Sequence, residues 1–225
     1  MGCSNEVRRM NPCFGKFAAL AALIAYSIIR APHGMRSQTI RVVEDRKGKL
    51  EIALLAGAFL GAFLPAIWAV TGFPAGADHP LHPAPYALGL LLLVVGLWLF
   101  QRTHIDLGTN WSFTLQTRDG HRLVTTGIHE RIRHPMYSAT FLIGIAHLLF
   151  IPNWIVGPAC LVTFGILYVF RDAREERLML DRFGHEYEAY LRKSGRLLPR
   201  LHSGVARVHR RGSLEEMPQQ RHGEE

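Results

Sequence analysis

Apolar residues occur along the chain in five long blocks separated by polar segments, a pattern typical of a protein that crosses a membrane several times. The clearest block, 52–70, contains no charged residue. As a helix it would measure about 28 Å, close to the thickness of a bilayer's hydrocarbon core. The other blocks cover 17–29, 85–100, 135–151 and 154–170. The sequence therefore predicts an all-α, polytopic integral membrane protein with five transmembrane helices.

The last two blocks are predicted to form a transmembrane helical hairpin. Only Pro152 and Asn153 separate them, and this dipeptide favours a tight turn over a continuing helix. The alternative is a buried hairpin of a soluble bundle. Neither block has a polar face that would meet water, so the membrane interpretation is favoured.

The chain divides into three parts by composition. Residues 1–16 are a mixed polar segment, 17–202 form one membrane domain, and 203–225 carry little apolar content and are expected to be a disordered tail. A cleaved signal peptide is the alternative for the first block. No small-x-small cleavage site follows it, because the next residues are Arg30-Ala31-Pro32.

Basic residues between the blocks predict the orientation. Lys and Arg number six in 30–51, five in 101–134 and twelve from 171 onward, but none occurs in 71–84 or 152–153. Under the positive-inside rule the basic segments are cytoplasmic, so the N-terminus is outside and the C-terminus inside. The membrane could be a bacterial inner membrane or the endoplasmic reticulum. The net charge of +8 flanks apolar blocks and does not form one basic face, so we expect no nucleic-acid partner.

Several common kinds of site are not expected. The three cysteines, Cys3, Cys13 and Cys160, lie far apart, and their spacing indicates neither a metal site nor a disulfide framework. Gly57-x-x-x-Gly61 lies inside an apolar block, where helix packing explains it better than a nucleotide-binding loop. Any cofactor site is therefore not of the Rossmann type.

Polar residues gather in two segments, 116–137 and 171–190, at the two ends of the predicted hairpin. Pro135 suits the first position of a helix, which places His134 at the positive end of the helix dipole. Because the hairpin brings its ends together, His134, Tyr137, Arg171 and Glu175 are expected to converge. The simpler alternatives are an interfacial helix start and a charge-paired surface with Arg171 and Glu175 at i,i+4.

The order of these polar residues resembles a known family. The motifs run from 108 to 199 and resemble those of the isoprenylcysteine carboxyl methyltransferases and the related membrane phospholipid methyltransferases. In chain order they are Gly108-x-Asn110-Trp111, Gln116, His121-x-Leu123-Val124-Thr125-x-Gly127, Arg133-His134-Pro135-x-Tyr137, Arg171-x-x-x-Glu175-Glu176 and Phe183-Gly184-x-x-Tyr187-x-x-Tyr190.

The resemblance implies a cofactor, S-adenosyl-L-methionine, held in a pocket at the cytoplasmic face. It assigns Arg171 to the acceptor's carboxylate. The family usually has Tyr at the position of His129 and often Gly at that of Ser138. The cofactor-binding residues implied by the resemblance are Gln116, His121, Arg122, Leu123, Val124, His129, His134, Pro135, Met136, Tyr137 and Glu175.

Three functions remain open at this stage. The preferred one is O-methylation of an isoprenylcysteine-like carboxylate. Transfer of a methyl group from a sulfonium to a carboxylate removes both opposite charges, so a water-poor pocket speeds it. The second is methylation of a phospholipid amine or a small thiol. An amine acceptor must first lose a proton, for which His129 or His134 could act as the base. The third is a non-enzymatic protein whose basic loops bind anionic lipid.

Overall fold

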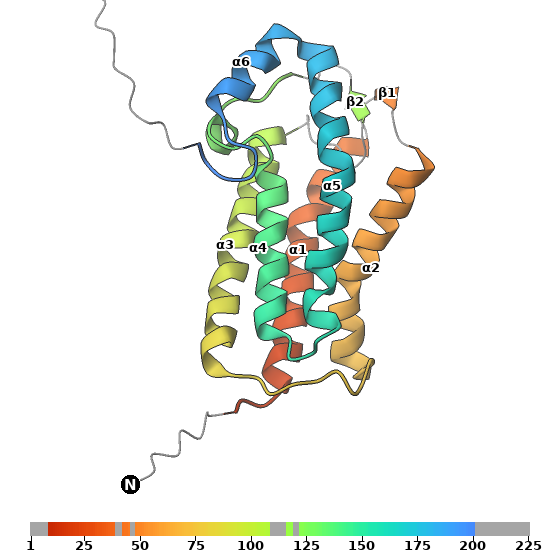
Figure 1. The fold of residues 1–225 in the computed structure, drawn as a ribbon, viewed down its shortest axis with the longest axis vertical. Coiled ribbons are helices and arrows are strands. Elements are labelled where there is room, and N and C mark those ends of the chain that lie inside the picture. Colours follow the sequence, from red (N-terminus) through yellow and green to blue (C-terminus); the bar gives the residue numbers. More distant parts are fainter. Residues whose placement is uncertain (1–8, 39–41, 46–47, 109–115, 119–121, 201–225) are drawn as a thin grey trace, which may run out of the picture.

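The structure, a computed structural model, describes residues 9–38, 42–45, 48–108, 116–118 and 122–200. Long helices running along one axis form a bundle (Figure 1). They are α1 (Cys13–Gln38), α2 (Lys49–Thr71), α3 (Pro83–Leu107), α4 (Pro135–Phe150) and α5 (Val156–Phe183). Within the described residues, four of them are long and apolar enough to cross a membrane, and α4 is a shorter apolar helix. The predicted helical membrane architecture is confirmed.

α4 matches its predicted block to within one residue, whereas α1, α2, α3 and α5 extend beyond theirs. The largest difference is in α5, which was predicted to end at Phe170 and continues to Phe183. This extension is rich in Ala, Arg, Glu, Leu and Met, residues with high helix propensity, so it remains helical after it leaves the apolar region. Gly184, with a φ of 49°, ends the helix. The last helix of the described residues, α6 (His185–Lys193), follows directly.

Two short strands were not predicted. β1 (Val42–Asp45) pairs antiparallel with β2 (Gln116–Arg118) beside the charged end of the bundle. Strands of three or four residues in polar connections carry no usable period-2 pattern, so sequence reasoning could not detect them.

Asn153 holds the turn of the hairpin, as the Pro152-Asn153 dipeptide predicted. Its Oδ1 accepts hydrogen bonds from the backbone N–H groups of Ile155 and Val156, at 3.1 and 3.0 Å, and so caps the start of α5. Its Nδ2 donates to Asp78 Oδ1 at 2.6 Å and to the carbonyl of Pro74 at 3.0 Å. One side chain thus ties the α4–α5 turn to the α2–α3 connection.

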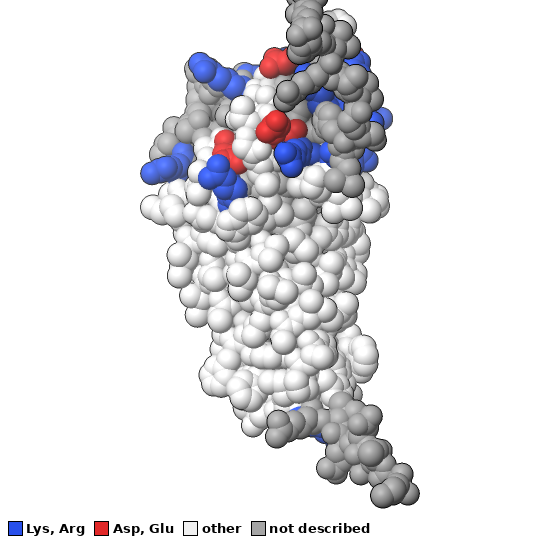
Figure 2. All heavy atoms as spheres, turned by 90° about the vertical axis from the view of Figure 1, so that its left-hand side faces the viewer, with Lys and Arg blue, Asp and Glu red and all other residues white. Residues whose placement is uncertain are grey.

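Charged side chains gather at one end of the molecule. On the face that Figure 2 shows, most of them lie at this end, a small basic patch lies at the opposite end, and the middle of the bundle shows none among the described residues. The described chain is therefore organised as an integral membrane protein.

α1 begins at the end opposite α6 (Figure 1), as an odd number of crossings requires. The absolute orientation stays a prediction, and the expected disordered tail lies outside the described residues.

Candidate active site

A cavity of about 610 Å³ lies within the bundle and reaches its charged end. That size is typical of small-molecule sites. Gln116 is in β2, with a side chain outside the description, and His121 lies outside the described residues. All the other predicted site residues line the cavity, namely Arg122, Leu123, Val124, His129, His134, Pro135, Met136, Tyr137, Arg171 and Glu175. Their roles toward a cofactor stay predictions.

Tyr137, Arg171 and Glu175 meet at the polar end of this cavity. Tyr137 is in the first turn of α4, and the other two are one turn apart on α5. The Tyr137 hydroxyl donates a hydrogen bond to Glu175 Oε2 at 2.8 Å, and Arg171 Nε lies 3.8 Å from the same oxygen. The predicted convergence of the two hairpin ends is therefore observed, with the rings of His134 and Tyr137 5.6 Å apart.

Glu51 is a second carboxylate beside Arg171, and sequence reasoning did not include it. It is in the first turn of α2 and only 2% exposed, with Oε1 3.8 Å from Arg171 Nη1. The available signal was an acidic residue directly before the apolar block 52–70. Ionisable residues at such positions often have a partner on another helix.

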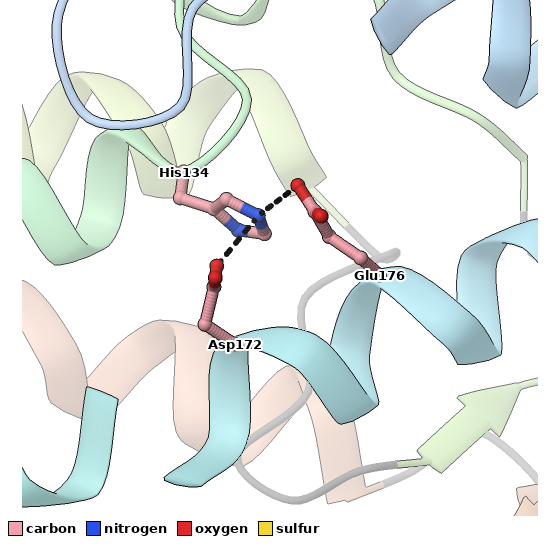
Figure 3. Close-up of side chains that lie close together, drawn as sticks. All are labelled: His134, Asp172 and Glu176. Atoms are coloured by element: carbon pink, nitrogen blue, oxygen red, sulfur yellow. Dashed lines mark ion pairs between the residues drawn. The ribbon is translucent and has the colours of Figure 1, made fainter. Parts of the chain in front are cut away.

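His134 faces two carboxylates on α5, as Figure 3 shows. Its Nε2 lies 3.2 Å from Asp172 Oδ1 and 3.5 Å from Glu176 Oε1. These three residue types could hold a metal ion. However, Arg133 lies 3.2 Å from Glu176, and Arg196 lies 3.1 Å from Asp172 and 2.7 Å from Glu176. Because two guanidinium groups already neutralise both carboxylates, the cluster is best described as an ion-pair network.

This network fastens the segment after α6 onto the start of α4. The backbone N–H groups of Arg133 and His134 donate to the carbonyls of Gly195 and Arg196, at 2.8 and 3.0 Å. Neither Glu176 nor Asp172 is among the described residues that line the cavity, whereas Glu175 is. The adjacent acids Glu175 and Glu176 therefore belong to different surroundings.

His129 is placed by contacts from two other helices. It is in the short 3-10 helix η2 (Gly127–Glu130). Asp106 on α3 accepts a hydrogen bond from the Ile128 N–H at 2.8 Å, and Tyr190 on α6 donates to the carbonyl of His129. The His129 side chain is 4% exposed, and its Nδ1 has no hydrogen-bond partner in the described part of the chain. Burial lowers its pKa to about 4, so the ring is neutral at physiological pH.

Two tyrosines of α6 also line the cavity, although the sequence analysis gave them no role. Tyr187 and Tyr190 are spaced i,i+3, which places them on one face of the helix. Burial raises the pKa of Tyr190 to about 12 and also raises that of Tyr187. Both hydroxyls are therefore neutral and can donate hydrogen bonds.

Beyond the polar end, the cavity continues along the helices into the apolar part of the bundle. Along α5 its wall runs from Glu175 to Cys160, a helical distance of about 22 Å. The wall in this part is mostly aliphatic and aromatic, with Ala19, Ala22, Leu23, Leu55, Ala58, Ala62, Ile143, Phe164 and Leu167 among its members. One continuous space therefore joins charged groups to an apolar passage.

Comparison with known proteins matches this part of the chain to membrane methyltransferases. Residues 84–186 fit the family model described as phospholipid methyltransferase. The resemblance to the methyltransferase family is therefore confirmed over this region. The region holds all but the first residue of α3 and the whole of α4 and α5, and so most of the polar end of the cavity.

Curated relatives are protein-S-isoprenylcysteine O-methyltransferases. The proteins of Mus musculus and Homo sapiens are each 31% identical, over 115 and 113 residues, which are 50% and 49% of this chain. These matches cover 41% and 40% of the two relatives, so the chain matches less than half of their length. Protein-S-isoprenylcysteine O-methyltransferase B of Arabidopsis thaliana is 26% identical over 107 residues, 47% of this chain and 54% of that protein.

A solved structure of the eukaryotic intramembrane Ras methyltransferase ICMT is also similar. The match covers 81% of this chain and 62% of that one, with 20% identity and a TM-score of 0.48.

Proposed function

We propose that the chain is an integral membrane methyltransferase that uses S-adenosylmethionine and methylates the carboxylate of a lipid-attached, isoprenylcysteine-like acceptor. The observation that carries this proposal is the single cavity that joins Arg171, Glu175 and Tyr137 to an apolar passage. A lipid chain fits the passage and a charged head fits the polar end. The curated relatives, whose names describe this reaction, support the same conclusion.

The residues at the polar end fit the proposed methyl donor. When bound, S-adenosylmethionine supplies a methyl group on a positively charged sulfonium. Glu175, which faces the cavity, would pair with the donor's ammonium group, and the Tyr137 hydroxyl holds Glu175 in place. Arg122, Leu123, Val124 and His129 line the cavity next to the start of α4 and would contact the rest of the donor.

Arg171 would orient the acceptor. Arg171 is 8% exposed and lines the cavity, and a planar guanidinium can hold a carboxylate through two parallel hydrogen bonds. Methyl transfer to a carboxylate removes charge as it proceeds, so burial of the site favours the transition state without a general base. Alignment of the two reactants is the main task of these side chains.

N-methylation of a phospholipid amine is the second candidate, and the description of the matched family model favours it. A protonated amine must lose its proton before it can attack. His129, with a pKa of about 4, is about six units less basic than an alkylamine such as lysine. This argues against His129 as the base for an amine acceptor and leaves His134 as the other histidine proposed for that role.

Incubation of the purified chain in detergent with labelled S-adenosylmethionine and three acceptors tests the proposal. We expect label on a farnesylcysteine analogue and little on phosphatidylethanolamine or methanethiol. The rate should be nearly constant from about pH 5 to neutrality, because a carboxylate is already ionised there. Transfer to phosphatidylethanolamine with a rate that rises steeply with pH would instead establish the second candidate.

Replacing Arg171 with Lys separates the acceptor's site from the donor's. Arg171→Lys keeps the charge but loses the planar fork, so kcat/KM for the farnesylcysteine analogue should fall about ten- to a hundredfold. Donor affinity, measured by calorimetry, should stay the same. An unchanged kcat/KM would remove Arg171 from acceptor binding.

A further inference from the structure

Arg171 lies between two carboxylates that come from different helices. Its Nη1 is 3.8 Å from Glu51 on α2, and its Nε is 3.8 Å from Glu175 on α5. The two distances are equal, and each acid approaches a different nitrogen of the guanidinium. The surroundings of the two acids, however, are not alike.

Only one of these acids can be reached from the cavity. The Glu175 side chain is 29% exposed and lines the cavity, where it accepts the hydrogen bond from Tyr137. The Glu51 side chain is 3% exposed and is not among the described residues of the cavity wall. A ligand in the cavity can therefore pair with Glu175 but cannot contact Glu51.

We propose that Glu51 is the permanent counter-ion of Arg171 and a positioning residue for acceptor methylation. This inference rests on the proposed function. A buried guanidinium needs a nearby negative charge at all times. Glu175 can leave Arg171 for the donor's ammonium group, whereas Glu51 stays paired in every state of the site.

The attraction of Glu51 at Nη1 also favours one orientation of the guanidinium plane. Because Glu51 lies at Nη1, the Nε side of the guanidinium, where Glu175 lies, is the side at which a ligand can replace a partner. The acceptor carboxylate then replaces Glu175 at this side and does not add a third acid around one cation. Two parallel hydrogen bonds require a fixed plane, so Glu51 controls orientation through Arg171 without touching the acceptor.

Replacement of Glu51 with Gln in the full chain tests this role. S-adenosylmethionine and N-acetyl-S-farnesylcysteine serve as the probes. We expect kcat to fall about tenfold, since orientation is lost, and the acceptor KM not to rise, since Arg171 keeps its charge. Donor affinity measured by calorimetry should remain within about twofold of wild type. Glu51→Asp, which keeps the charge on a shorter side chain, should restore part of kcat even if the Gln variant folds poorly.

Two further variants separate positioning from a purely structural ion pair. Lys49→Gln changes an exposed residue in the same turn of α2 and should leave kcat unchanged. In an Arg171→Lys background, where the planar fork is already absent, Glu51→Gln should lower kcat less than twofold, because the two changes act through one group.

Three results would overturn the inference in an active wild-type protein. They are an unchanged kcat in Glu51→Gln, an equal loss of kcat in the wild-type and Arg171→Lys backgrounds, and a loss of donor affinity as large as the loss of kcat. Wild-type protein that methylates no carboxylate acceptor would overturn the proposed function itself, and the inference with it. The assay of the wild-type protein therefore tests the proposed function on its own, and the variants then test the role of Glu51.

Discussion

Glu175 and Glu176 are neighbours in sequence, and the structure places them in different surroundings. Glu175 faces the cavity, and Glu176 pairs with Arg133 and Arg196. Glu175→Gln should therefore weaken S-adenosylmethionine binding about ten- to a hundredfold, through loss of a charge-assisted contact worth about 1.5–3 kcal/mol. Glu176→Gln is the matched control and should lower the thermal midpoint with little change in donor affinity. Calorimetry on both variants measures the donor affinity. If the Glu175 and Glu176 variants bound the donor equally well, Glu175 would not be part of the donor site.

His129 should make folding stability depend on pH. Burial lowers its pKa to about 4, with nearby Asp106 opposing the shift and His134 adding to it, against about 6.5 in the unfolded chain. Below pH 6.5 the unfolded chain binds more protons, so the contribution of His129 is fully present above this pH and is lost as pH falls toward 4. The loss between pH 7.5 and pH 5 should be about 2 kcal/mol.

The His129→Tyr variant isolates this contribution, because it has no imidazole at that position. Thermal midpoints of both proteins should be measured at the two pH values. Wild type should lose more stability than the variant on acidification. Parallel losses would show that His129 is protonated in the folded protein as readily as in the unfolded one.

At the scale of elements, α2 and α5 pack closely at Gly61. A Cβ on Gly61 would overlap Thr163 Oγ1 and lie 2.9 Å from the carbonyl oxygen of Ala159, whereas a Cβ on Gly57 would meet nothing within 4 Å. Gly61→Val should therefore lower the thermal midpoint clearly, at a cost of about 1–3 kcal/mol for overpacking. Gly57→Val, in the same helix and one turn away, should be much milder. Similar midpoints for the two variants would contradict the close approach of the helices.

Sequence reasoning located most of the elements because long apolar blocks report burial in lipid directly. It placed the end of α5 too early, since its charged extension has no hydropathy signal and is helical through propensity and local pairs. It also singled out Tyr137, Arg171 and Glu175, which the structure brings together at the polar end of the cavity. Glu51 was missed because its partner is on another helix, and a contact between helices cannot be read from one segment.

For the whole molecule, the orientation can be tested by labelling. Ala75→Cys in the α2–α3 connection and Glu130→Cys in η2 both replace exposed residues, in a background without the native cysteines. A membrane-impermeant thiol reagent applied to intact cells should label position 75 and not position 130, because the basic segments are predicted to be cytoplasmic. Disruption of the membrane should expose both. The reverse pattern would place the cavity mouth on the side away from the cytoplasm, where S-adenosylmethionine is made.

The uninterrupted course of α5 joins events in the lipid to events at the charged end. Its 28 residues form a rod of about 42 Å, anchored at its start by Asn153 and carrying Arg171 and Glu175 near its other end. A membrane thinner or thicker than the apolar part of this rod changes its tilt. Tyr137 is on a different and shorter helix, α4. A tilt of α5 would therefore move Arg171 and Glu175 relative to Tyr137. We therefore expect the acyl-chain length of the surrounding lipids to affect the alignment of the reacting groups.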